Sequence, residues 1–168
     1  MREGVFRVAL TLVLTVVCVR SLAPSVRGHA SMYVGGTIAG IDKGEKGKLD
    51  AQAESLIFSP DKGRDISIPY AQITAIDYGE HVGRRVAAAI IVAWPLLFSH
   101  KKRHYLTIYF NQDPAKAAAE RDQLAKDPKA SAVGDVAAFE INKQDFADVM
   151  DVLQAKTGLK ARLEEVSH

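Results

Sequence analysis

Apolar residues in this 168-residue chain recur with the period of short β-strands, and they change to a helical period only near the C-terminus. The clearest strand is 105–110, where Leu106, Ile108 and Phe110 form one face. Further short apolar runs, each bounded by turn residues, lie at 33–41, 48–51, 55–59, 66–68, 73–78 and 135–141. The chain is therefore expected to build a sheet from about seven short strands.

The last apolar segment has the spacing of an amphipathic helix that begins after Asn142 and ends before Gly158. Its large apolar residues fall at i, i+3, i+4 and i+7, and they are Phe146, Val149, Met150 and Leu153. Such a stripe has to be covered, so we expect the helix to cap the sheet.

A shorter helix is predicted at 115–126, because Asp113 suits the N-cap and Pro114 the first helical position. Leu124 is its only large apolar residue, so we expect a short helical excursion that packs weakly. The sequence as a whole predicts a mainly β fold. We expect an antiparallel sandwich or partly open barrel of about seven strands with a C-terminal capping helix.

Residues 1–30 have the layout of a signal peptide. Arg2 and Arg7 precede the uncharged apolar core 8–19, and cleavage is expected after Ala30. An uncleaved membrane anchor is the alternative, although a helix over that core reaches only about 18 Å, short of a bilayer. We therefore expect an exported protein that resides in the periplasm or cell envelope, either free or peripherally on a membrane.

Cleavage would leave a single domain, 31–160, and a polar tail, 161–168. An earlier cut after Ala23 also fits the small residues there, but it places Pro24 directly after the cleaved bond. The only cysteine, Cys18, lies in the leader. The domain is therefore expected to be stabilised by packing and not by disulfides.

The first 30 residues carry four of the 22 Lys and Arg residues and one of the 20 Asp and Glu residues. The remaining chain is thus nearly neutral, which argues against nucleic-acid binding because that role needs a basic domain. Positive charge is concentrated at 81–112, where five Lys and Arg residues occur without an acidic residue.

Within that region, the apolar run 86–98 lies between two groups of cations. This layout suits a surface that meets anionic lipid head groups, and Trp94 suits the boundary between apolar and wet regions. As a helix the run would cover roughly 20 Å, too little to span a bilayer. The candidate membrane- or ligand-binding residues are Arg84, Arg85, Trp94, Leu96, Leu97, Phe98, Lys101, Lys102 and Arg103.

Two other roles fit the same run. It would also suit a buried helix or strand pair that completes the core, with Pro95 at the bend. It would equally suit a patch that binds another protein, including a second subunit.

Histidines supply the one pattern that suggests a metal site. His100 and His104 are four residues apart, which would place them on one face of a helix, with His81 as a third ligand. His104, however, adjoins the strand 105–110, where residues four apart are separated by about 13 Å. No neighbouring Asp, Glu or Cys completes a set, so we expect neither a metal nor another cofactor.

Catalytic motifs are missing from the sequence. The glycines lack the spacing of a phosphate-binding loop, and no serine occupies a nucleophile elbow. We therefore expect a protein that is not an enzyme. A hydrolase that uses the histidines near the cationic segment is the catalytic alternative.

The pattern resembles the pleckstrin-homology-like fold, particularly small bacterial versions and GRAM-type domains. The resemblance rests on 56–58, on 68–70 with the apolar residues that follow, on 105–108, and on the closing helix up to Gly158. A group of uncharacterised exported bacterial proteins is also similar, with a related Gly83-Arg84-Arg85 and a related 101–108 core. The run 86–98 is not part of the general pattern.

The resemblance implies a domain that binds phosphoinositides, other lipids or peptides and has no catalytic activity. Combined with the cationic segment, it predicts a non-catalytic exported module that docks on an envelope membrane surface or an envelope protein through 84–104. The alternative is a structural protein that uses the same segment as a subunit interface.

Overall fold

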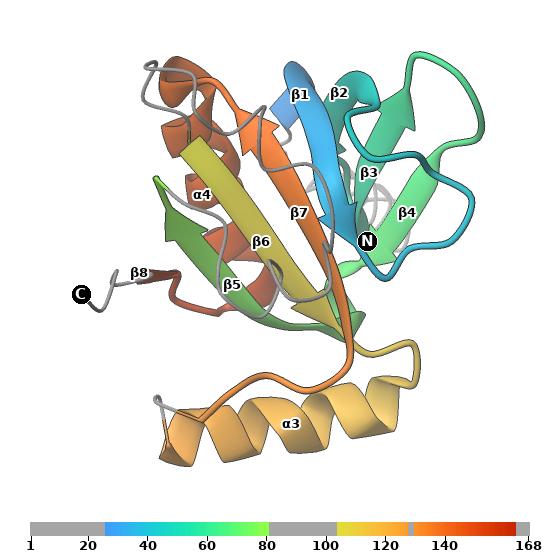
Figure 1. The fold of residues 1–168 in the computed structure, drawn as a ribbon. Coiled ribbons are helices and arrows are strands. Elements are labelled where there is room, and N and C mark those ends of the chain that lie inside the picture. Colours follow the sequence, from blue (N-terminus) through green and yellow to red (C-terminus); the bar gives the residue numbers. More distant parts are fainter. Residues whose placement is uncertain (1–25, 81–103, 128–129, 164–168) are drawn as a thin grey trace, which may run out of the picture.

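A computed structural model describes residues 26–80, 104–127 and 130–163 of the chain (Figure 1). Its strands and helices, in chain order, are β1 (Val26–Gly36), β2 (Lys46–Ala51), β3 (Ser55–Pro60), β4 (Ile66–Pro69), the 3-10 helix η1 (Tyr70–Gln72), β5 (Ile73–Gly79), β6 (His104–Phe110), α3 (Pro114–Lys126), β7 (Asp135–Ile141), α4 (Lys143–Thr157) and β8 (Arg162–Leu163). The described part of the chain contains no helix that is both long and apolar enough to cross a bilayer.

The strands form one open sheet in the order β4-β3-β2-β1-β7-β6-β5-β8. Strands β1 to β4 form one antiparallel series and β5 to β7 a second, and the pairing of β1 with β7 joins them. In the view of Figure 1, α4 lies behind the sheet and α3 lies below it. The mainly β class, the capping C-terminal helix and the short helical excursion are thus confirmed.

The sheet differs from the prediction in its eighth strand. After α4 the chain returns to the sheet, where β8 pairs parallel with β5, so the sheet is mixed. Arg162 secures this strand because its Nε donates to Asp77 Oδ1 at 2.7 Å and its Nη1 to the carbonyl of Ala130. The predicted polar tail 161–168 therefore includes a short strand of the sheet, β8.

Strand β1 begins earlier than expected. The predicted boundary between 1–30 and 31–160 falls inside it, because Val26 pairs with Ala51 and His29 with Leu49. In this structure, residues 26–30 thus contribute to the sheet.

The main core lies between the sheet and α4. Three rings contributed by separate strands meet there, with Phe58 and Phe139 centred 5.2 Å apart and Tyr33 beside both. The predicted stripe of α4 packs against these strands, with Val149, Met150 and Leu153 buried and Phe146 half-buried. Gly158 ends the helix in the left-handed conformation, with φ of 70°, as the sequence predicts.

Gly36 allows β1 and β7 to approach closely. Its φ is +150°, and a Cβ built at this position would overlap the carbonyl oxygen of Val136. Any side chain here would separate the two strands that join the halves of the sheet.

Polar contacts hold α3 in place. Asp113 caps its N-terminus by accepting from the amide of Ala115, and Ala117 is its one buried residue. Arg121 donates to the carbonyl oxygens of Tyr70 and Ile73, which fixes the helix to η1 and β5. The shortage of apolar residues in α3 is therefore offset by charge-assisted hydrogen bonds to the backbone.

Candidate functional site

The nine residues predicted to bind a membrane or ligand lie outside the described residues. They are Arg84, Arg85, Trp94, Leu96, Leu97, Phe98, Lys101, Lys102 and Arg103. His81 and His100 also fall within the undescribed segment 81–103. The structure does show the part of the sheet to which both ends of this segment connect.

The segment 81–103 joins two neighbouring strands. It follows the end of β5 and precedes the start of β6, and Gly79 of β5 is the register partner of Tyr105 of β6. The chain therefore leaves the sheet and returns to it at adjacent points. Both ends of the segment are thus attached to the same part of the sheet.

A group of three rings, the base cluster, lies at this point and consists of Tyr78, His104 and Phe146. The hydroxyl of Tyr78 lies 2.8 Å from Nδ1 of His104, and the two rings are nearly parallel. The ring of Phe146 from α4 stacks on Tyr78 with the centroids 3.9 Å apart. The cluster thus ties together β5, β6 and the first turn of α4.

A second contact joins α4 to the sheet beside the base cluster. Nδ1 of His29 lies 2.9 Å from Oδ1 of Asp145, and both side chains are partly exposed. Asp145 stands in the first turn of α4, where a carboxylate is favoured by the helix dipole. His29 belongs to the residues that the sequence analysis assigned to the leader, so this contact was missed.

Two buried polar atoms near the cluster make no hydrogen bond to any described residue. They are Nε2 of His104 and Oγ of Ser31. Both residues are register partners of Ile141, so their side chains lie on the same face of the sheet as α4. Ser31 and His104 thus do not form a hydrogen-bonded nucleophile and base within the described part of the chain.

The described residues contain no group of three His, Cys, Asp or Glu side chains that could hold a metal ion. His104, the one member of the predicted triplet that the structure describes, is instead occupied at Nδ1 by Tyr78.

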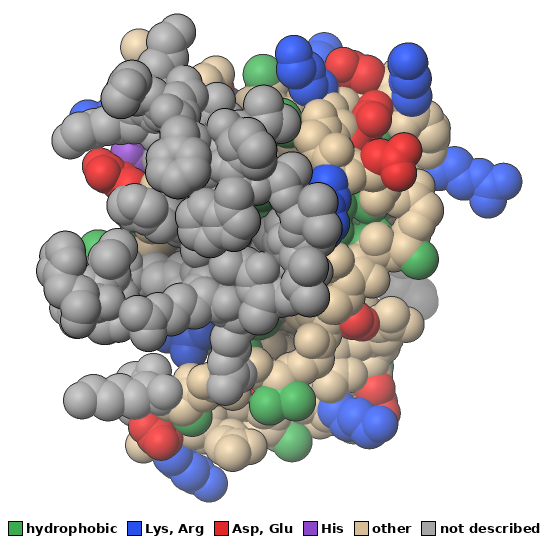
Figure 2. Space-filling view, in the orientation of Figure 1, with side chains coloured by type: hydrophobic (Ala, Val, Ile, Leu, Met, Phe, Trp, Pro, Cys, Tyr) green, Lys and Arg blue, Asp and Glu red, His purple; other side chains and the backbone are tan. Residues whose placement is uncertain are grey.

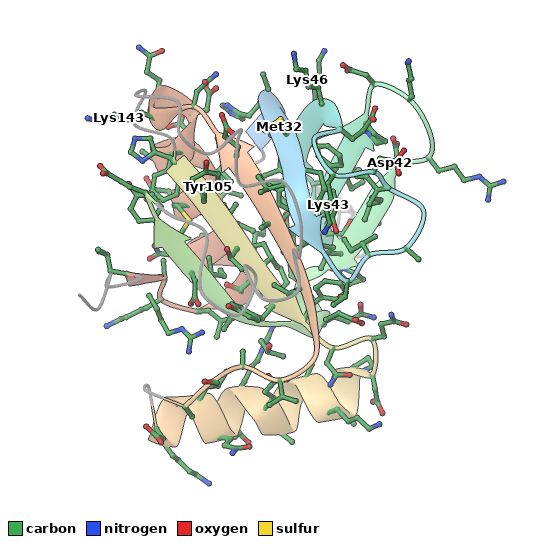
Figure 3. The ribbon with its side chains drawn as sticks, in the orientation of Figure 1. Met32, Asp42, Lys43, Lys46, Tyr105 and Lys143 are labelled. Carbon is green, nitrogen blue, oxygen red and sulfur yellow. The ribbon has the colours of Figure 1, made fainter. Side chains whose placement is uncertain are left out.

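The face of the sheet opposite α4 will be called the outer face. One row of register partners crosses it from β5 to β2: Gly79, Tyr105, Glu140, Met32 and Lys46. Tyr105 is only 3% exposed, Met32 is half-buried and Lys46 is exposed. Figure 3 labels these three side chains on β6, β1 and β2. Burial on the outer face therefore increases towards the strands that carry the segment.

Ionisable groups with shifted pKa values lie elsewhere in the fold. Burial raises the pKa of Tyr33 in the core, and it lowers the pKa of Arg121 on α3. Burial, together with Asp50 and Glu54, raises the pKa of Tyr70 to about 12. Each of these residues packs within the fold, so these shifts do not indicate a reactive site.

Comparisons with known proteins add little to this description. No protein-family model matches the sequence, and no curated protein matches it. One similar solved structure is described as the structure of the Spt16D Pob3N heterodimer, with a TM-score of 0.43 and 9% sequence identity. The match covers 81% of this chain and 55% of that chain, so this chain spans about half the length of the protein it matches. The fold itself defines the class of the protein, which is a mainly β domain with a helix packed against an open sheet.

Proposed function

We propose that this chain is a non-catalytic, exported binding module that docks on an anionic membrane surface of the cell envelope through 84–104. The observation that supports the proposal is the register pairing of Gly79 with Tyr105. The two ends of the segment join neighbouring strands of the sheet. The cations at both ends are therefore close in sequence to the same part of the sheet. Arg84 and Arg85 follow Gly79 closely, and Lys101 to Arg103 directly precede β6.

The base cluster would provide the rigid support that such a site needs. Tyr78, His104 and Phe146 come from three elements, and their stacked rings fix the sheet end against α4. A binding segment whose two ends are held by packed elements loses less conformational entropy on binding than one on a free loop.

The charges would supply most of the selectivity for anionic lipid. Each basic residue near such a surface contributes about 1 kcal/mol, and salt screens this attraction. Trp94 and the apolar run would add contacts at the boundary between head groups and acyl chains. The resemblance to pleckstrin-homology-like and GRAM-type domains, many of which bind lipids, agrees with this role.

Sedimentation with vesicles tests the proposal. We expect the protein to sediment with vesicles that contain phosphatidylglycerol at low salt, and to remain in solution with purely zwitterionic vesicles. Replacing Arg84, Arg85, Lys101, Lys102 and Arg103 by Gln should release it.

A matched control removes the same number of charges elsewhere. Lys43, Lys46, Lys48, Lys62 and Arg64 are all exposed, and their replacement by Gln should leave vesicle binding mostly intact. Equal loss in both variants would indicate a general charge effect and would contradict the proposed site. Concentration-dependent self-association without vesicle binding would favour the subunit-interface alternative.

A further inference from the structure

Strand β1 begins at Val26, inside the region that the sequence assigns to the leader. Its pairing with β2 extends to both ends of β2. Lys46, the first residue of β2, is the register partner of Met32, and Ala51, the last, is the register partner of Val26. The pairing of β2 is therefore complete when β1 starts at Val26, and it is incomplete when β1 starts at residue 31.

Residues 26–30 also have contacts and a backbone geometry that belong to a folded element. Nδ1 of His29 lies 2.9 Å from Oδ1 of Asp145 on α4. Gly28 has a φ of 70°, which favours glycine, and it lies where the register between β1 and β2 shifts. A contact between separate elements and a glycine at a strand irregularity serve the fold of the domain. They serve no purpose in a segment that is removed.

The residues just before Val26 match the pattern that a signal peptidase reads. Ala23 and Ser25 are small and are separated by one residue, as in the A-x-A-like motif before a cleaved bond. Pro24 lies between them, so it does not follow the cleaved bond as it would after a cut at Ala23. A leader of residues 1–25 has the usual length of about 15 to 30 residues.

The positions of two arginines also favour a cut before Val26. The uncharged apolar core 8–19 is followed by Arg20 and Arg27. A cut after Ala30 would leave both arginines between the core and the cleaved bond. A cut before Val26 leaves Arg27 in the domain and brings the bond closer to the core, which is the usual order in a signal peptide.

We propose that a signal peptidase hydrolyses the peptide bond between Ser25 and Val26, so that the mature chain begins with the first residue of β1. This inference rests on export, which is part of the proposed function. Water is the second reactant. Its hydroxyl group goes to the carbonyl carbon of Ser25, and its remaining proton goes to the nitrogen of Val26, which becomes the new α-amino group. The leader departs with the apolar core, and the domain keeps every residue of β1.

The described surface suits a domain that is separated from its apolar leader. On the side that carries β2 to β4, Figure 2 shows Lys and Arg side chains interspersed with Asp and Glu. Within residues 26–80, 104–127 and 130–163, the exposed large apolar side chains are those of Val133 and Leu163. A few such side chains are normal on a domain in water. This part of the surface is therefore compatible with water once the leader is gone.

Cleavage of the full-length chain by a purified bacterial signal peptidase in detergent tests the site. The product is identified by its intact mass and by N-terminal sequencing. We expect residues 26–168, with Val26 at the N-terminus. A product that begins at Pro24 or at Ser31, or a chain that is not cleaved, would overturn the inference.

Two variants of the full-length chain make the assay specific. Ser25→Phe places a large side chain directly before the proposed bond and should abolish the cleavage. Ala30→Phe is the matched control, because it would block only a cut after Ala30, and it should leave the product unchanged. Both are assayed directly after dilution from urea, so the result does not depend on whether a variant folds. Cleavage that is lost in Ala30→Phe and kept in Ser25→Phe would place the site after Ala30.

The cleavage site and membrane docking fail separately. A protein that is cut after Ser25 and does not bind anionic vesicles would retain the cleavage site and reject docking. A protein that binds these vesicles but is cut elsewhere, or keeps its leader, would retain docking and reject the cleavage site.

Discussion

The hydroxyl of Tyr78 and Nδ1 of His104 lie 2.8 Å apart and join the end of β5 to the first residue of β6. His104 is buried, and its other ring nitrogen has no hydrogen-bond partner among the described residues. The contact with Tyr78 is therefore the hydrogen bond that compensates the burial of the imidazole.

Replacing Tyr78 by Phe should destabilise the protein by about 1 to 2 kcal/mol, because it leaves Nδ1 of His104 buried without a partner. The ring of Phe would retain the stack on Phe146, so the loss reports on the hydrogen bond alone. Urea unfolding followed by circular dichroism measures the change. An unchanged unfolding midpoint would show that the imidazole is satisfied in another way.

The start of β1 gives a prediction about the boundary of the domain. A protein of residues 31–168 lacks His29 and its contact with Asp145, together with the first pairs between β1 and β2. We expect it to be less stable than a protein of residues 24–168 by roughly 1 to 2 kcal/mol. Thermal unfolding of the two purified forms measures this difference.

His29→Gln in the longer form separates the side-chain contact from the strand pairing. Part of the loss should appear in this variant and the remainder only in the shorter form. Identical melting of the two lengths would instead place the structural boundary at residue 31, as the sequence analysis expected.

The spacing of apolar residues predicted those strands and helices that bury one face along their whole length. Strand β6 and the stripe of α4 were both found as predicted, because alternation and i, i+4 spacing reflect which face is buried. The strand β8 was missed because two residues that pair in parallel leave no periodic signal. Arg121 was missed as an anchor because its acceptors, the carbonyls of Tyr70 and Ile73, are distant in sequence.

The candidate site was predicted only in part. Charge and apolar composition mark the segment 81–103 in the sequence, and its nine proposed residues stay a prediction because they lie outside the described residues. Composition does not predict the base cluster of Tyr78, His104 and Phe146. Tyr78 and Phe146 were each placed on an apolar face, but their stacking depends on how α4 crosses the sheet. His29 was assigned to the leader because its neighbours resemble a cleavage site.

Gly36 should be the glycine least tolerant of substitution at the junction of β1 and β7. Gly36→Ala places a methyl group against the carbonyl of Val136 and imposes a φ of +150° on alanine, so we expect a loss of about 3 kcal/mol or more. Gly40→Ala is the matched control, because its φ of +81° is also strained but nothing lies near its added Cβ. That variant should lose about 1 kcal/mol. Equal losses by urea unfolding would mean that the close approach of the strands contributes nothing.

Alkaline stability should depend on Tyr70. Its hydroxyl donates to the carbonyl of Gln52 at 2.9 Å, and burial, with Asp50 and Glu54, raises its pKa from 10.0 to about 12. Because the pKa is higher in the folded than in the unfolded protein, the stabilisation is complete below pH 10 and is lost as the pH rises towards 12. Tyr70→Phe should unfold at a lower denaturant concentration at neutral pH, and its stability should fall less steeply over this alkaline range. Tyrosinate absorbance during titration gives an independent check, since one late-titrating group should disappear in the variant. If both proteins lose stability with the same slope, Tyr70 ionises freely and the burial argument for its hydroxyl is wrong.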